Sequence, residues 1–301
     1  MRLIKPSFEI WEQSVGLEGV YKQIEKVGRV CYKSEDKITE DSAKPFVDRM
    51  IKSGHGAMLE HGTVYLQYEV VKGAINPLTK YYLNKYSKVK AKEGAIGETM
   101  RLFVTTNLRV LVENGWLDDL QYICEPTEYH ERRVTVHFVC DRGVSHEFVR
   151  HRVMSFAQES TRYCNYSKDK FGNELTFIIP CWLDVPTGHY AYWDGDWCDI
   201  DKMKIQLPEG EHKDIDAFLW TLNNAETHYT LLINSGWKPQ EARAVLPNSL
   251  KTELVVTGFT SDWNHFFDLR ARGTTGAPHP QAKELAEPLM KEFIARKYID
   301  N

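Results

Sequence analysis

Three arginines, a histidine and a serine gather in one short stretch of this 301-residue chain. Arg150, His151 and Arg152 are consecutive, Ser160 follows eight positions later, and Arg162 comes two positions after that. Guanidinium groups bind phosphate oxygens and planar imide or carboxylate edges through paired hydrogen bonds. A basic triplet alone is more often a solvated surface feature, but the serine and the third arginine at fixed distance favour a binding site. The stretch therefore predicts a site for a phosphorylated small molecule.

The residues around this cluster predict a strand, a short helix and an irregular connection. Residues 134–139 alternate with a period of two, which is typical of a half-buried strand, and residues 141–143 interrupt the alternation. Val144 and Phe148 are four positions apart and share one face of a helix. The Arg150–Arg152 triplet should therefore emerge at the end of that helix.

Elsewhere the sequence predicts helices interspersed with short strands. Residues 42–53 form a helix closed by Gly54, residues 63–70 form a strand, and residues 76–116 hold helical pieces, the clearest around Leu108 and ended by Asn114 and Gly115. The lysine-rich run from Lys80 to Lys92 is interpreted as a solvated helix or loop.

The C-terminal third has the longest periodic element, a helix from about 214 to 235 that Gly236 ends. Pro239 fits the first turn of a second helix, which carries Arg243 and stops before Pro247. Residues 254–256 form a short strand, and Ser261 caps a helix whose aromatic side chains Trp263, Phe266 and Phe267 pack inward. The predicted fold class is α+β, a mixed sheet with flanking helices in a single domain over residues 1–301.

Composition narrows the classes of function. A net charge of −4 argues against a non-specific nucleic-acid binder, which would need a strongly segregated basic face. The six cysteines show no CxxC spacing and the N-terminal residues lack the long apolar core of a signal peptide, so a cytoplasmic location is expected. No apolar run approaches the length of a membrane span, so we expect neither nucleic acid nor membrane as a partner.

Three other kinds of site find little support. His55 and His61 have no nearby cysteine pair, so no metal site is predicted. Neither a GxGxxG nor a Walker sequence occurs to bind phosphates. No cysteine lies in a Pro-Cys-His context, so each is interpreted as a small buried side chain rather than a nucleophile.

Five ordered motifs resemble those of the flavin-dependent thymidylate synthases. They span residues 20 to about 290 and are Gly28-Arg29-Val30-Cys31-Tyr32, Gly54-His55 with Glu60-His61, Arg150-His151-Arg152 with Ser160 and Arg162-Tyr163, Glu241 to Pro247, and Asn264 with Leu269-Arg270. Segments 65–132 and 181–212 have no clear counterpart in compact members of that family and are interpreted as insertions.

The resemblance implies methylation of dUMP to dTMP. Methylenetetrahydrofolate would give the carbon, FAD would carry hydride and NADPH would reduce the flavin. It also implies a homotetramer with active sites shared between subunits. Two alternatives stay open: a related folate-dependent hydroxymethylase or methylase of another pyrimidine nucleotide, and a nucleotide- or RNA-binding module in which the arginines only bind phosphates.

The same resemblance assigns roles to individual residues. Arg270 is the catalytic candidate, because its counterpart faces the uracil imide, where a fixed positive charge favours negative charge on the ring. The residues expected to bind dUMP are Glu147, Arg150, Gln158, Ser160, Thr161, Arg162, Arg243 and Arg270. Those expected to bind FAD are His55, Ala57, Glu60, Arg150, His151, Arg152, Gln158 and Asn264. Glu159 is expected to share the role of Gln158, and His61 to be a satisfied core histidine.

Overall fold

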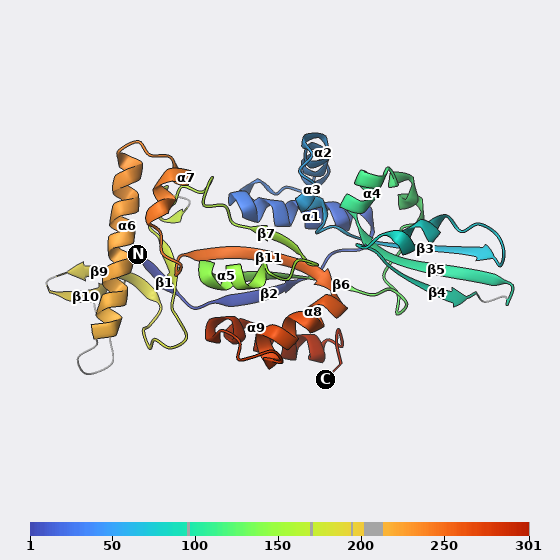
Figure 1. Cartoon of the computed structure of the whole chain (residues 1–301). Coiled ribbons are helices and arrows are strands. Elements are labelled where there is room, and N and C mark those ends of the chain that lie inside the picture. Colours follow the sequence, from blue (N-terminus) through green and yellow to red (C-terminus); the bar gives the residue numbers. More distant parts are fainter. Residues whose placement is uncertain (95–96, 169–170, 194, 202–212, 301) are drawn as a thin grey trace.

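The structure is a computed structural model that describes residues 1–94, 97–168, 171–193, 195–201 and 213–300 (Figure 1). The predicted α+β class is confirmed, with eleven strands in three sheets within the described ranges. The part of predicted insertion 181–212 that spans 202–212 lies outside them. No helix in these ranges is long and apolar enough to cross a membrane.

The central sheet has the strand order β2-β6-β11-β7 and is antiparallel throughout. Its strands are β2 (Ser7–Trp11), β6 (Arg133–Asp141), β7 (Ser155–Gln158) and β11 (Lys251–Phe259). β11 pairs with β6 along its full length, from Lys251 opposite Asp141 to Phe259 opposite Arg133. Because β6 pairs with all nine of its residues, β11 is longer than the three residues predicted, and Glu253 and Gly258 are strand residues despite low β propensity.

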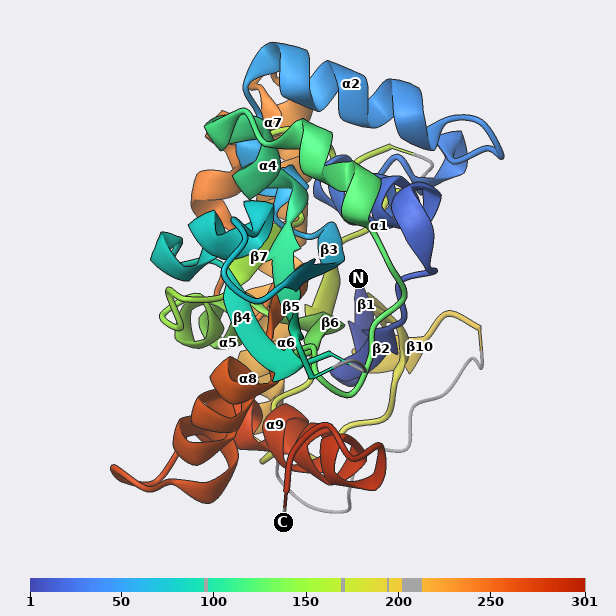
Figure 2. The same cartoon turned by 90° about the vertical axis from the view of Figure 1, so that its right-hand side faces the viewer.

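Helices cover the two faces of this sheet, as Figures 1 and 2 both show. On one face α5 (Arg142–Phe148), α8 (Thr260–Phe267) and α9 (Pro280–Ala295) enclose a core that includes Val136, Phe138, Phe148, Trp263 and Phe266. On the other face α1 (Gly16–Tyr32) packs Val27 and Val30 against Ala157 and Val255. The predicted strand over 134–139 and the helix after it are confirmed as β6 and α5. The alternation arises because successive side chains of a strand point to opposite faces.

A second sheet lies at one end of the molecule and includes the only parallel pairing among the described strands. Its order is β10-β9-β1-β8, formed by β1 (Arg2–Ile4), β8 (Thr176–Ile178), β9 (Gly188–Trp193) and β10 (Asp196–Asp199). The long helix α6 (Lys213–Asn234) packs its predicted apolar stripe into the same core, with Leu219, Leu222 and Tyr229 buried. The predicted helix over 214–235 is therefore confirmed.

A three-stranded antiparallel sheet extends from the opposite end of the central sheet (Figure 1). We call residues 63–123 the arm; it consists of β3 (Thr63–Val71), β4 (Lys88–Glu93), β5 (Thr99–Asn107), α4 (Leu108–Asn114) and two 3₁₀ segments, Pro77–Leu83 and Leu117–Tyr122. The predicted strand over 63–70 and the helix around Leu108 are confirmed.

Two predictions within the arm are wrong. Residues 88–93 and 99–107 are strands rather than helical pieces, and the lysine-rich run enters the 3₁₀ segment and the edge strand β4 instead of a solvated helix or loop. Lys88, Lys90 and Lys92 are every second residue of β4 and are exposed. Their spacing of two residues is therefore that of a strand. Lysines on an edge strand discourage pairing with other chains.

Helix boundaries show two smaller corrections. α8 begins at Thr260, one residue before the predicted cap, and the Asp262 carboxylate accepts from the Phe259 amide at 3.3 Å while Ser261 Oγ donates to Glu131 at 2.5 Å. Arg243 lies on a 3₁₀ turn, Arg243–Val245, that follows the short helix α7 (Pro239–Ala242). The helix over 42–53 is confirmed as α2 (Ala43–Ser53), closed by Gly54 with a left-handed φ of 71°.

A buried ionic network joins the end of α1 to strands β6 and β11 and to the residue that follows β7. Lys251 Nζ lies 2.7 Å from carboxylate oxygens of both Glu159 and Glu253, and Lys33 Nζ lies 2.6 Å from Glu253. His137 Nε2 lies 2.9 Å from the other Glu253 oxygen. Burial alone would raise the pKa of Glu253, but the His137 hydrogen bond and the two lysine charges hold it well below its usual range. Glu159 therefore faces inward, toward Lys251, and a role shared with Gln158 stays a prediction.

This network generates a prediction for stability. In Lys251→Met the Glu159 carboxylate, whose side chain is fully buried, keeps its charge but loses its cation. Leaving one partner of a buried ion pair uncompensated costs about 3–5 kcal/mol. Urea unfolding should show that loss, whereas Lys90→Met on the exposed edge of β4 should change the free energy of unfolding by less than about 0.5 kcal/mol. Equal losses in the two variants would contradict the network's role.

Candidate functional site

Arg270 makes the most extensive contacts of the predicted site residues. It lies in a π-helical turn, Asp268–Arg272, that continues α8, and its side chain is 13% exposed. Its Nη1 lies 2.6 Å from Glu147 Oε2, and its Nη2 donates to the Glu147 carbonyl at 2.7 Å. Its Nε donates to His151 Nε2 at 3.2 Å, and Arg150 Nη1 lies 3.1 Å from Glu147 Oε1. We call Glu147, Arg150, His151 and Arg270 the Arg270 junction.

Local structure explains why these four side chains meet. Asp141 caps α5 by accepting from the Val144 amide at 2.7 Å, and the helix ends where the triplet begins. The buried rings of Phe148 on α5 and Phe266 on α8 lie 5.0 Å apart, which fixes the two helices against each other. The wider π-helical turn follows directly, a feature often found at functional sites.

His151 is the buried member of the junction and carries no charge at neutral pH. Its ring lies 4.9 Å from that of Phe266 and 5.9 Å from that of His265. Burial, together with the positive charges of Arg270 and His265, lowers the pKa of His151 to about 4. Because Nε2 accepts from Arg270, the proton of the neutral ring resides on Nδ1.

A second group lies between the segment after β7 and α7. Arg243 Nη1 donates to Thr161 Oγ1 at 3.2 Å, and Arg162 Nε donates to Gln240 Oε1 at 3.1 Å. The Ser160 amide donates to the Cys31 carbonyl at 3.0 Å, which ties this segment to the end of α1. Within the described ranges neither Arg162 nor Arg243 has a carboxylate partner. Two exposed, uncompensated guanidiniums favour binding of an anion.

Gln158 connects this second group to the helix of the junction. Its Nε2 donates to Ser145 Oγ on α5 at 2.9 Å and to Thr252 Oγ1 on β11 at 3.2 Å. Gln158 stands two residues before Ser160, and Ser145 stands two residues before Glu147. Gln158 thus ties the start of the second group to α5, the helix that leads to Glu147.

The residues predicted to line the flavin are more dispersed. His55 and Ala57 are exposed at and after the start of the single-turn helix α3 (Gly56–Leu59), and Glu60 ends that helix. α3 lies against β7, and among the described residues no hydrogen bond or ion pair joins it to Arg270. Arg152 is exposed, and Asn264 accepts a hydrogen bond from Arg272 at 2.9 Å. His61 is buried, as predicted, with Nδ1 2.8 Å from Thr257 Oγ1. Its buried Nε2 has no hydrogen-bond partner among the described residues, so the ring, contrary to the prediction, is not fully satisfied.

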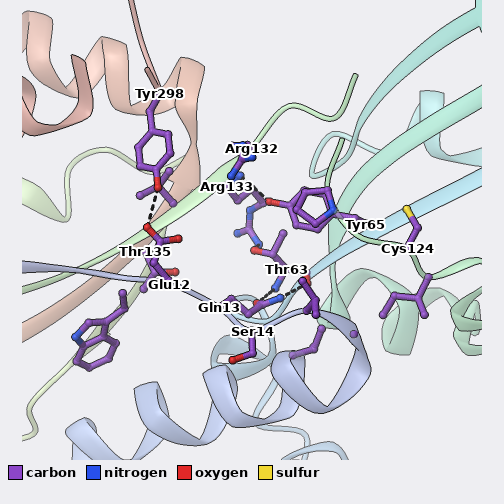
Figure 3. Close-up of a pocket in the computed structure, with 17 residues that line it drawn as sticks. Glu12, Gln13, Ser14, Thr63, Tyr65, Cys124, Arg132, Arg133, Thr135 and Tyr298 are labelled. Atoms are coloured by element: carbon purple, nitrogen blue, oxygen red, sulfur yellow. Dashed lines mark hydrogen bonds between the residues drawn. The ribbon is translucent and has the colours of Figure 1, made fainter. Parts of the chain in front are cut away.

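Three hollows in the described part of the chain have volumes of about 70, 480 and 590 Å³. Figure 3 shows the first, a narrow slot where Arg133, Tyr65 and Thr63 face the start of α1 and Tyr298. Of the predicted site residues, Glu147 alone lines one of the three, the hollow of 590 Å³ beside Trp182 and His279. Apart from Glu147, the predicted site residues of a single chain therefore line none of these three hollows.

The structure also adds residues that the sequence did not indicate. They support the candidates directly and are Arg109 beside Glu60, Gln240 beside Arg162, Ser145 and Thr252 beside Gln158, and His265 beside His151. Gln240 and His265 each adjoin one of the five motifs in the sequence, and that position could have indicated them as site residues. Arg109 lies in a segment without a readable motif. In the described ranges no cluster of three or more His, Cys, Asp or Glu side chains is arranged to hold a metal ion.

Comparison with known proteins places the chain in a family. Residues 126–296 match the family model described as thymidylate synthase complementing protein, and the chain belongs to that family. The resemblance inferred from the five motifs is thereby confirmed.

Individual relatives extend this result. A flavin-dependent thymidylate synthase from Pyrococcus furiosus is 31% identical over 160 residues, 53% of each chain. One from Corynebacterium aurimucosum is 22% identical over 284 residues, 93% of this chain and 78% of the relative. The chain thus spans about half the length of the first of these relatives. A crystal structure of a UMP/dUMP methylase, PolB from Streptomyces cacaoi, covers 98% of this chain and 93% of its own at 16% identity and a TM-score of 0.44.

The low pKa of His151 generates a prediction about acid stability. The unfolded chain binds the proton near pH 6.5 and the folded chain only near pH 4, so this stabilising contribution is full above pH 6.5 and is lost as the pH falls toward 4. His151→Gln should remove up to about 2–3 kcal/mol of that loss in flavin-free protein. Urea titrations at several pH values measure it, with exposed His228→Gln on α6 as the control. A wild-type slope retained in His151→Gln would mean that His151 is not held neutral.

Proposed function

We propose that the chain is a flavin-dependent thymidylate synthase that methylates dUMP to dTMP. Methylenetetrahydrofolate is the carbon donor, FAD the cofactor and NADPH the reductant. Membership of the family and the names of the relatives support the proposal. The single observation that carries it in this chain is the Arg270 junction, an arginine fixed on two sides beside an uncharged histidine.

Arg270 can bind a ligand while it keeps its hydrogen bonds to Glu147 and His151. A guanidinium has five N–H groups, and three of those of Arg270 donate to Glu147 and His151 within the described part of the chain. The two others are available for the planar imide edge of a pyrimidine. Because the side chain is already ordered, little conformational entropy is lost when it meets negative charge on the ring.

The residues of the triplet fit a flavin dinucleotide. The side chain of Arg150 is 68% exposed, Arg152 is exposed, and Arg152 makes no ion pair with any described residue. Two accessible guanidiniums suit a pyrophosphate, and neutral His151 adds no charge of its own beside them. The bound flavin would supply hydride transfer. The chain would contribute binding, orientation and the positive charge at Arg270.

The expectation that every cysteine is buried is wrong: Cys140 and Cys164 are buried, but Cys31, Cys124 and Cys198 are partly exposed and Cys181 is exposed. Burial raises the pKa of Cys31 and of Cys124 to about 11, and it raises the pKa of Cys140 and Cys181 as well. The reactive form of cysteine is the thiolate, which such environments disfavour at neutral pH. We therefore assign the chemistry to positioning and electrostatics rather than to a covalent protein–pyrimidine bond.

The proposed active site is shared between subunits of a homotetramer in the cytoplasm. Among the described residues no hydrogen bond or ion pair joins His55, Ala57 or Glu60 to Arg270, and none of the three lines the hollow beside Glu147. A site completed by a second copy would bring the two sets together. The folate would then bind at the flavin, on residues that remain to be assigned.

The first test is the colour of the protein and the identity of its product. Protein purified with FAD should show flavin absorption and should convert dUMP to dTMP when methylenetetrahydrofolate and NADPH are supplied. His151→Ala should weaken flavin binding more than dUMP binding, because His151 is proposed to line the flavin and its ring, packed against Phe266, holds the triplet in place. Colourless protein that still binds dUMP would favour a nucleotide-binding module, and a hydroxymethylated product would favour the related enzyme class.

Arg270 variants separate catalysis from structure. Arg270→Ala should slow the dUMP-dependent step at least a hundredfold, because one preorganised donor at a developing negative charge contributes about 3–4 kcal/mol. Arg270→Lys keeps the charge without the planar fork and should retain part of the rate. Reduction of the flavin by NADPH without nucleotide should change far less. Rapid-mixing measurements compare the two half-reactions, and equal slowing of both would make Arg270 a structural ion-pair residue.

A further inference from the structure

Glu60 receives hydrogen bonds from two directions. On one side Arg109, on helix α4 of the arm, places Nη1 2.5 Å from Glu60 Oε1. On the other side Arg133, on β6 of the central sheet, donates from Nη1 to the Glu60 backbone carbonyl at 2.9 Å. Glu60 ends α3, a helix of only four residues. Such a short helix has little stability of its own, so external contacts determine its orientation.

Arg109 lies directly on the turn that precedes Glu60. A Cβ atom on Gly56, the first residue of α3, would lie 3.0 Å from Arg109 Nε and 3.3 Å from Glu113 Oε1. The absence of a side chain at Gly56 therefore makes room for the arginine. Arg109 Nε is itself held by Glu113 at 2.7 Å, within the same helix α4. The arm thus presents a fixed guanidinium to α3.

Arg133 fixes the opposite side of the same segment. Besides the Glu60 carbonyl it contacts Thr63 Oγ1 and Ser155 Oγ, both at 3.3 Å. Burial lowers its pKa to about 10, so it stays charged at neutral pH. Arg133 thus belongs to the central sheet. Arg109, on α4, is the residue through which the arm contacts Glu60.

We propose that Arg109 is a positioning residue, which orients α3 through Glu60 so that the arm controls how tightly the chain binds its flavin. The inference rests on the proposed function, in which His55, Ala57 and Glu60 line the flavin. It gives the predicted insertion 65–132 a role. Arg109 and Glu60 are about a third exposed, 37% and 27%, so their ion pair adds little to global stability. Its effect should be confined to the order of α3.

The test compares Arg109→Ala with Arg101→Ala. Arg101 forms an ion pair with Glu69 on the same arm at similar exposure, 34% and 30%, and no hydrogen bond or ion pair joins it to the described residues of α3. Hydrogen exchange of flavin-free protein should be faster across residues 55–62 in Arg109→Ala only. If the binding-competent orientation falls to about a tenth of the molecules, the Kd for FAD rises about tenfold. Arg109→Lys should recover part of the affinity, and Glu113→Gln, which keeps the Glu60 contact, should change it less.

The outcomes separate this inference from the proposed function. Wild-type protein that binds no flavin overturns the proposed function and the flavin role of Arg109 together. Wild type that binds flavin, with unchanged exchange and affinity in Arg109→Ala, overturns only the role of Arg109. Equal effects in Arg101→Ala would show a general loss of the arm's structure and also overturn it. Arg109→Gln, which keeps the length of the side chain, replaces the alanine variant if that variant fails to fold.

Discussion

The candidate site depends on the ion pair between Arg270 and Glu147. It joins the end of α5 to the π-helical turn after α8, two segments separated by more than a hundred residues in sequence. The contact is made possible by aromatic packing beneath it, because Phe148 and Phe266 are both fully buried and in contact. Apolar burial thus supplies the stability, and the ion pair determines where the guanidinium lies.

The charges around this ion pair are divided in a way that suits an anionic ligand. Glu147 is the carboxylate at the junction, and it has both Arg150 and Arg270 as partners. His151 is kept neutral, and Arg162 and Arg243 have no carboxylate partner among the described residues. In the network of Glu253, by contrast, the lysines are paired with carboxylates, and Lys251 contacts Glu159 directly after β7. The first set of cations supports the proposed binding of a phosphorylated substrate, and the second stabilises the fold.

Sequence reasoning succeeded where local patterns determine structure. The alternation over 134–139, the apolar stripe of α6 and the left-handed glycine after α2 each depend on neighbouring residues alone, and each prediction is confirmed. It failed where tertiary pairing decides. β11 extends through Glu253 and Gly258 because β6 pairs with it along its whole length, and the lysines of β4 belong to an edge strand. The inward turn of Glu159 toward Lys251 also depends on a residue 92 positions away. The roles given to individual site residues by resemblance stay predictions, and the contact of Arg109 with Glu60 had no signal in the sequence.

The central claim is tested most directly by anaerobic turnover of the purified protein. The gene for the chain is first introduced into a thymidine-requiring strain. The account predicts growth without thymidine, and dTMP from dUMP only when flavin, NADPH and methylenetetrahydrofolate are all present. Folded protein loaded with flavin that yields no dTMP would contradict the account. So would dTMP formed at an undiminished rate after the flavin is removed.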